Sequence, residues 1–193
     1  MRGTGAVPLN SFPAKSNRMN TVLNTDRLVL RPLRAGDAAR VRALCGNWNI
    51  ARMLARVPHP YPEGLAEEWI GAQAALWAKG ESYIFAVTLD GDVIGVIGLE
   101  GEDDGTYELG YWLGEPWWGH GYMSEAVARV LDFAFDDLKL PRVIAGYFAD
   151  NPASGRIQDK FGFRMIRQGT LECRARGQAA PAIFTELRAG ARP

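Results

Sequence analysis

The chain has 193 residues, of which 47% are hydrophobic and 23% are charged, a balance typical of a globular protein. Its 22 basic and 22 acidic residues cancel, and they form no basic block that could neutralise a nucleic-acid backbone. No apolar run approaches the length of a membrane span. We therefore expect no nucleic-acid partner, no membrane partner and a cytoplasmic location.

The polar residues 1–20 predict a flexible N-terminal tail, and residues 21–193 predict a single domain without repeats or linkers. Two cysteines, Cys45 and Cys173, are too few for a disulfide framework, and we expect both to be inert small hydrophobic residues. These cysteines and the two histidines are scattered, so no metal site is expected.

The N-terminal third predicts one strand and two helices. The segment RLVLRPL, residues 27–33, alternates apolar and polar residues, as strands do. Residues 35–46 predict a helix with Asp37 as its N-cap. Residues 62–80 predict a second helix that opens with a proline and stops at Gly80.

The hydrophobic period then changes from helical to two. Two strands, residues 82–89 and 93–100, are joined by the hairpin signal Asp90-Gly91-Asp92. The remaining predicted elements are a strand at 106–113, a long helix at 124–140, a strand at 142–149, a short helix at 151–163 and two strands at 164–177 and 181–188. Because the long helix joins 106–113 to 142–149, a right-handed crossover makes these strands parallel neighbours.

A glycine-rich turn precedes the long helix in the stretch EPWWGHGYMSEAV, residues 115–127. Gly119 and Gly121 let the backbone bend, and the helix start offers free N–H groups to an anion such as a phosphate. One alternative is a tight connection without a ligand. Another is dinucleotide binding, but Ser124 replaces the third glycine of that motif and antiparallel strands precede it.

Three segments together resemble the GNAT superfamily of acyl-CoA-dependent N-acetyltransferases, most of all the branch that acetylates ribosomal-protein N-termini. They are TDRLVLRPL, ELGYWLGEPWWGHGYMSEA and NPASGRIQDKFGF, and the resemblance runs from about residue 25 to 187. It implies an α/β (α+β) fold: a mixed, mostly antiparallel sheet of about seven strands, flanked by about four helices, with a splayed parallel strand pair.

The resemblance also implies which residues hold acetyl-CoA. The backbone edges of Tyr111, Trp112 and Leu113 would pair with the pantetheine arm, and Asn151 and Ser154 would contact it. The pyrophosphate would lie on the turn formed by Trp118, Gly119, His120, Gly121, Tyr122, Met123 and Ser124. Trp118 departs from the polar residue of the family motif, and Met123 departs from its small residue.

Acyl transfer to an amine needs a base and a proton donor for the thiolate. Glu108 is the first candidate base, although a glutamate in a cross-strand charge pair fits it equally well. Glu172 is the second, from the opposite side of the cleft. Ser154 occupies the place of a serine near the sulfur in the similar branch, and Gln158 replaces the tyrosine of many family members. Ser154 and Asn151 could also be ordinary helix-start residues.

These residues predict an acyltransferase that moves an acetyl group from acetyl-CoA directly to a primary amine, on a small molecule or a protein N-terminus. The alternative is a non-catalytic acyl-CoA-binding module, and homodimer formation stays open. Around His59, the residues Trp48, Tyr61 and Trp69 either form an aromatic acceptor pocket or pack in the core, which is the default for such residues.

Overall fold

The computed structural model describes residues 21–191, so the predicted tail at 1–20 lies outside the described residues. One sheet of eight strands runs through it in the order β1-β2-β3-β4-β5-β6-β8-β7. The strands are β1 Leu23–Asn24, β2 Val29–Pro32, β3 Ser82–Leu89, β4 Asp92–Gly101, β5 Tyr107–Leu113, β6 Arg142–Phe148, β7 Arg164–Cys173 and β8 Gln178–Arg188.

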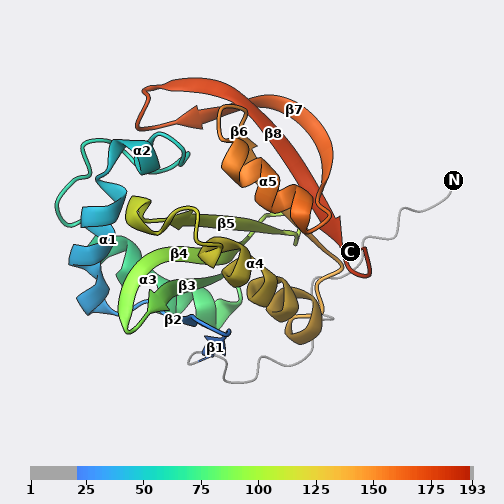
Figure 1. Ribbon diagram of the computed structural model, residues 1–193, viewed down its shortest axis with the longest axis horizontal. Coiled ribbons are helices and arrows are strands. Elements are labelled where there is room, and N and C mark those ends of the chain that lie inside the picture. The colour runs from blue at the N-terminus through green and yellow to red at the C-terminus, as the bar shows by residue number, and fades with distance from the viewer. Residues whose placement is uncertain (1–20, 192–193) are drawn as a thin grey trace, which may run out of the picture.

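Five α-helices flank this sheet: α1 Ala38–Cys45, α2 Trp48–Ala51, α3 Leu65–Lys79, α4 Tyr122–Asp132 and α5 Pro152–Lys160. Helices α4 and α5 lie in front of the sheet in Figure 1, and α3 lies behind it. Every strand pair is antiparallel except β5 with β6, which is parallel. The predicted mixed, mostly antiparallel fold is therefore confirmed.

Several local predictions are confirmed. Asp90 and Gly91 both have positive φ, 52° and 92°, as the two-residue hairpin turn between β3 and β4 requires. Gly80 ends α3 in the left-handed conformation, with φ 73°. The Asn151 side chain caps α5, because its Oδ1 accepts a hydrogen bond from the Ser154 backbone N–H at 3.2 Å.

Some elements differ from the prediction. The long helix begins at Tyr122, and its last turn, Phe133–Asp137, is a π-helix in which Leu138 N–H bonds to Phe133 O. The two-residue strand β1 and the four-residue helix α2 are too short to leave a periodic pattern. Asp37 precedes α1 but makes no capping bond to it.

Asp37 instead ties strand β2 to the turn that follows it. Its carboxylate accepts two hydrogen bonds from the Arg31 guanidinium, at 2.8 and 2.9 Å, and a third from the Arg34 backbone N–H. Asp37 therefore occupies the predicted N-cap position of α1, but its carboxylate bonds to Arg31 and Arg34 and not to the helix N–H groups.

Each face of the sheet carries its own hydrophobic cluster. Val127, Val130 and Leu131 of α4 pack with Leu109 and Leu113 of β5 on one face. On the opposite face a smaller cluster joins α1 to α3 through Ala38, Val41, Cys45, Ala66 and Ile70, with Trp112 packed against it. Strand β5, whose side chains alternate between the two faces, therefore lies between the two helical layers.

The parallel pair β5–β6 is held at a single level, where Glu108 faces Ile144. Strand β5 remains paired with β4 up to Leu113, while β6 turns to pair with β8. Consequently the C-terminal half of β5 has one unpaired edge, and a gap opens between the two strands. The predicted splayed pair is confirmed, and it is the feature that positions the candidate site.

Candidate active site

A cavity of about 740 Å³ lies at the gap between β5 and β6. It is lined by the end of β5, the turn before α4, the start of α5 and the segment around α2. Its lining includes eleven of the predicted coenzyme residues: Tyr111, Trp112, Leu113, Trp118, Gly119, Gly121, Tyr122, Met123, Ser124, Asn151 and Ser154. His120 belongs to the same turn but is not among the lining residues.

The turn before α4 depends on its two glycines. Gly119 and Gly121 both have φ of 80°, a conformation that residues with a side chain rarely adopt. Gly121 is the N-cap of α4 and has no side chain that could satisfy the first N–H groups of the helix. These N–H groups and the positive end of the helix dipole remain available to an anion.

The two motif departures have simple structural reasons. Met123 is 6% exposed and belongs to the hydrophobic cluster under α4, so its bulk lies largely in the core. Trp118 donates its indole N–H to the Leu113 carbonyl at 2.7 Å and so joins the turn to the end of β5. A tryptophan can therefore replace the polar residue of the motif, because its indole N–H still forms a hydrogen bond that stabilises the turn.

Tyr111 and Ser154 meet on the α4–α5 face of the gap. The Tyr111 hydroxyl lies 2.9 Å from Ser154 Oγ. Burial raises the pKa of the Tyr111 phenol, although hydrogen bonds with Ser154 and Gln158 act in the opposite direction. Gln158 is 2% exposed and accepts a hydrogen bond from Thr185 Oγ1 at 2.7 Å. The residue that replaces the family tyrosine is thus part of a fixed polar network.

Glu108 lies on the opposite face of β5, where Glu100 of β4 is its direct cross-strand partner. Burial raises the pKa of the Glu108 carboxyl; Arg56 lowers it, and Glu102 and Glu100 raise it further. A carboxyl with a raised pKa is better matched to proton transfer near neutral pH. The predicted charge pair is absent at this position, because the partner across the strand is another glutamate.

Gly110 and Gly146 have no side chains to cover the backbone of β5 and β6 beside Glu108. Nothing lies within 4 Å of the place where a Gly110 Cβ would stand, and a Cβ on Gly146 would lie 3.6 Å from Glu108 Oε1. Gly110 separates Glu108 from Trp112 along β5. A substrate approaching this face can therefore reach the β5 backbone between two large side chains.

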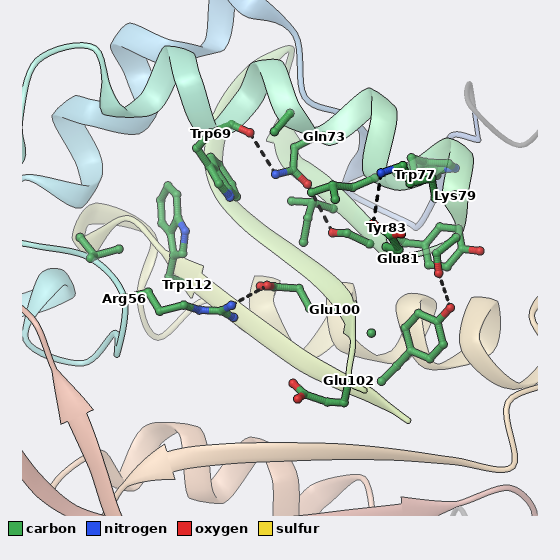
Figure 2. A pocket seen from close by; sticks show the side chains of 18 of the residues that line it. Arg56, Trp69, Gln73, Trp77, Lys79, Glu81, Tyr83, Glu100, Glu102 and Trp112 are labelled. Atoms are coloured by element: carbon green, nitrogen blue, oxygen red, sulfur yellow. Dashed lines mark hydrogen bonds and ion pairs between the residues drawn. The ribbon is translucent and has the colours of Figure 1, made fainter. Parts of the chain in front are cut away.

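A second cavity, of about 1260 Å³, lies on this side of the sheet (Figure 2). Glu100 and Trp112, the strand neighbours of Glu108, line it, but Glu108 itself lines neither cavity. Arg56 forms an ion pair with Glu100 at 2.8 Å in it, and Trp69 stands above Trp112. The acidic lining residues are Glu81, Glu100, Glu102 and Asp103, and the basic ones are Arg56, Lys79 and Arg174. Trp112 lines both cavities, so the two spaces are neighbours at this residue.

The other predicted residues separate into two groups. Tyr61 and Trp69 pack against the α1–α3 cluster, as expected of core residues, and they also line the second cavity, so an aromatic acceptor pocket stays a prediction. His59 and Trp48 contact each other, with ring centroids 5.2 Å apart, and line neither cavity. Glu172 is exposed on β7 and lines neither cavity.

Three basic residues of the first cavity were missed in the sequence. Arg156 and Lys160 lie one helical turn apart on α5, and Arg52 follows α2. The i, i+4 spacing after the NPAS segment was a usable signal, because it places two cations on one side of a helix already linked to the coenzyme. Arg52 gave no comparable signal, since it comes to the cavity only through the fold.

Neither cysteine is poised for chemistry. Both Cys45 and Cys173 are buried, and burial raises the pKa of the Cys45 thiol to about 12. Within residues 21–191, no group of three His, Cys, Asp or Glu side chains could hold a metal ion. No helix in the same range combines the length and the apolar character needed to cross a membrane.

A sheet opened at its parallel pair, with a glycine turn on one side and a capped helix on the other, defines an acyltransferase of the type that the resemblance implies. The profile of the acetyltransferase (GNAT) domain matches residues 27–164, and the chain belongs to this family. The prediction of an acyltransferase enzyme is thereby confirmed.

Relatives support the same assignment. The chain is 30% identical over 157 residues to the uncharacterized N-acetyltransferase YoaA of Bacillus subtilis, covering 79% of this chain and 87% of the relative. It is 28% identical to the ribosomal protein uS5 alanine N-acetyltransferase of Escherichia coli, covering 79% and 82%. The structure of Mycobacterium smegmatis RimJ in complex with CoA-disulfide shares the fold, with a TM-score of 0.73, 20% identity and coverage of 88% and 87%.

Proposed function

We propose that the chain transfers an acetyl group from acetyl-CoA directly to a primary amine. The observation that carries this proposal is that two cavities share Trp112 in their lining, one on the α4–α5 side of β5 and the other on the opposite side. One space would hold the donor and the other the acceptor. A binding module for acyl-CoA alone would have no need of the second space.

The first cavity suits the coenzyme in size and chemistry. Its volume of about 740 Å³ falls in the usual range for small-molecule sites. The free edge of β5 can pair with the pantetheine amides as an added strand would. The glycine turn can hold the pyrophosphate, and Arg156 and Lys160 can pair with the remaining phosphate. Asn151 fixes the start of α5 beside the arm.

The chemistry divides between the two faces of β5. Glu108, directly or through a water, would take a proton from the ammonium, and the nitrogen of the free amine then bonds to the thioester carbon. A backbone N–H on the free edge of β5 would stabilise the oxyanion. The carbon–sulfur bond then breaks, and the proton that the attacking nitrogen loses reaches the departing sulfur through the Ser154 hydroxyl, which gains one proton as it gives one and which Tyr111 contacts. No covalent acetyl-enzyme is needed.

The acceptor is a primary amine on a protein N-terminus or a small molecule. The relative named as a ribosomal-protein alanine N-acetyltransferase favours a protein N-terminus. Four acidic and three basic residues line the second cavity, and Glu100 and Glu81 are paired with Arg56 and Lys79, so only a slight excess of negative charge would attract the positive charge that amines carry at neutral pH.

The proposal is tested by titrating acetyl-CoA into the protein by calorimetry and by measuring thiol release across a panel of amines and N-terminal peptides. We expect saturable binding and release above background with at least one acceptor. Binding with background release throughout would instead support the non-catalytic module.

A further inference from the structure

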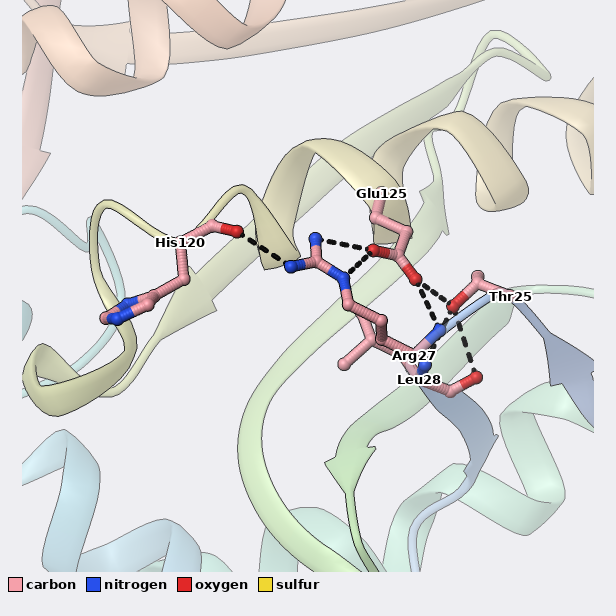
Figure 3. Close-up of polar contacts among 5 residues, drawn as sticks. All are labelled: Thr25, Arg27, Leu28, His120 and Glu125. Atoms are coloured by element: carbon pink, nitrogen blue, oxygen red, sulfur yellow. Dashed lines mark hydrogen bonds and ion pairs between the residues drawn. The ribbon is translucent and has the colours of Figure 1, made fainter.

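Residues at the start of the fold bind the turn before α4 and the first turn of that helix through hydrogen bonds and an ion pair (Figure 3). Arg27 lies between β1 and β2, almost a hundred positions before Glu125 of α4. Its Nε donates to Glu125 Oε2 at 2.7 Å, and its Nη2 lies 2.7 Å from the same oxygen. The other carboxylate oxygen accepts from the Arg27 backbone N–H at 2.9 Å and from the Thr25 hydroxyl. We call Thr25, Arg27 and Glu125 the clasp.

The clasp extends into the turn itself. Arg27 Nη1 donates to the His120 carbonyl at 3.1 Å. The guanidinium carbon lies 4.5 Å from the centre of the Tyr122 ring, and that ring stacks on His120 with centroids 5.7 Å apart. Arg27 therefore holds the residue on each side of Gly121.

The hydrogen bond from Arg27 fixes the orientation of the peptide group between His120 and Gly121. In a trans peptide the carbonyl and the following N–H point in opposite directions. Because Arg27 holds the His120 carbonyl on its own side, the Gly121 N–H is directed to the other side of the turn. Gly121 lines the first cavity and His120 does not, in agreement with this orientation.

Arg27 also offsets a charge that would oppose an anion. Glu125 lies in the first turn of α4, where a carboxylate suits the helix dipole but repels a phosphate at the same helix end. Burial would raise the pKa of Glu125, but hydrogen bonds from Thr25 and Arg27 lower it below its usual value, so it stays ionised. Within residues 118–124 no Lys or Arg supplies a compensating charge.

We propose that Arg27 is a positioning residue for the coenzyme: it orients the turn before α4 and neutralises Glu125, so that the turn can bind the pyrophosphate. The inference rests on the proposed function, because it takes acetyl-CoA as the ligand of the first cavity. It assigns the conformation of that site to a residue far away in sequence and outside the cavity lining.

The test compares a donor that has a pyrophosphate with one that lacks it. Calorimetry on Arg27→Met should show an acetyl-CoA dissociation constant raised at least about tenfold, the scale of one lost charge-assisted hydrogen bond. The kcat/KM for S-acetylpantetheine, which lacks the pyrophosphate and nucleotide, should stay near the parent value. Arg27→Lys, which keeps the charge but not the planar fork, should lose less affinity.

Two further variants complete the design. Adding Glu125→Gln to Arg27→Met removes the uncompensated carboxylate and should restore part of the acetyl-CoA affinity. Arg188→Met breaks a remote surface ion pair with Glu186 at 2.8 Å and should leave both donors unaffected. Thermal melting identifies any variant that fails to fold, and Arg27→Lys then carries the test.

An unchanged acetyl-CoA affinity in folded Arg27→Met, or equal losses for both donors, would overturn the role of Arg27 while the proposed function stands. A parent protein that does not bind acetyl-CoA would overturn both.

Discussion

The Tyr111 hydroxyl lies 2.9 Å from Ser154 Oγ, so a side chain from β5 crosses the gap and meets the first turn of α5. This contact joins β5 to α5, the helix that follows β6, beyond the level at which β5 and β6 are paired. Both residues line the first cavity. The phenol therefore stands beside the one hydroxyl that the resemblance places near the sulfur, and it does so from a strand instead of from position 158.

Replacing Tyr111 by Phe tests whether this contact serves the reaction. The variant keeps the ring and removes only the hydroxyl, so kcat should fall while the acetyl-CoA dissociation constant changes little. The loss of one hydrogen bond should lower the free energy of unfolding by about 1 kcal/mol. Steady-state kinetics, calorimetry and thermal melting give the three values.

Thr88→Val is the matched control, because Thr88 is also buried and donates one hydrogen bond, to the Val29 carbonyl at 2.7 Å. It should lose similar stability without a fall in kcat. Equal kinetic losses in the two variants would reduce Tyr111 to a structural role.

Glu108→Gln keeps the shape of the side chain and removes the base. Turnover should fall by about 10²–10⁴-fold, with acetyl-CoA affinity nearly unchanged, because Glu108 lies on the acceptor face. The deficit should shrink as pH rises, since more of the amine then arrives deprotonated. A pH–rate profile of kcat for both proteins measures this.

Glu172→Gln gives the corresponding test of the second carboxylate, which is exposed on β7. A loss confined to that variant would contradict the assignment of Glu108. A loss in Glu108→Gln that is the same at every pH would mean that Glu108 binds the charge of the acceptor and does not take its proton.

The same carboxyl should make stability depend on pH. Because the folded-state pKa of Glu108 is raised, the folded protein binds more protons at this site than the unfolded chain does. Its contribution to the free energy of unfolding therefore falls as pH rises from the unfolded value, about 4.3, through the folded one. Glu108→Gln should melt higher than the parent at neutral pH, and the difference should vanish at low pH. A parent that melts higher at neutral pH would be inconsistent with the raised pKa.

Gly121→Val should weaken acetyl-CoA binding strongly. Its φ of 80° disfavours any side chain, so the turn must distort even though the nearest atom to a new Cβ, Arg27 Nη2, lies 3.6 Å away. Gly91→Val, at a φ of 92° in the β3–β4 turn, applies comparable backbone strain far from the cavity. Calorimetry should show lost affinity only in Gly121→Val, and intact affinity there would remove the turn from the site.

Local sequence patterns predicted most of the fold and the glycine turn before α4. Alternation, the hairpin signal at Asp90-Gly91 and the cap at Asn151 each depend on neighbouring residues alone, so a single sequence displays them. The splayed pair followed from chain connectivity and from the family resemblance. Element ends were less predictable, because the start of α4 depends on a left-handed glycine and its last turn on packing.

Contacts between distant segments could not be predicted in this way. Nothing near Arg27 in the sequence indicates that it reaches Glu125, and nothing near Tyr111 indicates that it reaches Ser154. The sequence likewise does not indicate that Met123, which replaces the small residue of the family motif, is 6% exposed and packs in the core under α4. The positions of these three side chains depend on how they are directed in the folded chain, which the sequence pattern does not indicate.

Mass spectrometry of the acceptor after incubation with acetyl-CoA tests directly whether the chain transfers an acetyl group to a primary amine. Each peptide of an N-terminal panel is presented with its α-amine free and, as a control, with the same amine blocked. We expect the free amine to gain one acetyl group, an equal amount of CoA to be released, and the protein itself to carry no acetyl group. Bound acetyl-CoA without an acetylated product from any amine, or an acetyl group retained on the protein, would contradict this expectation.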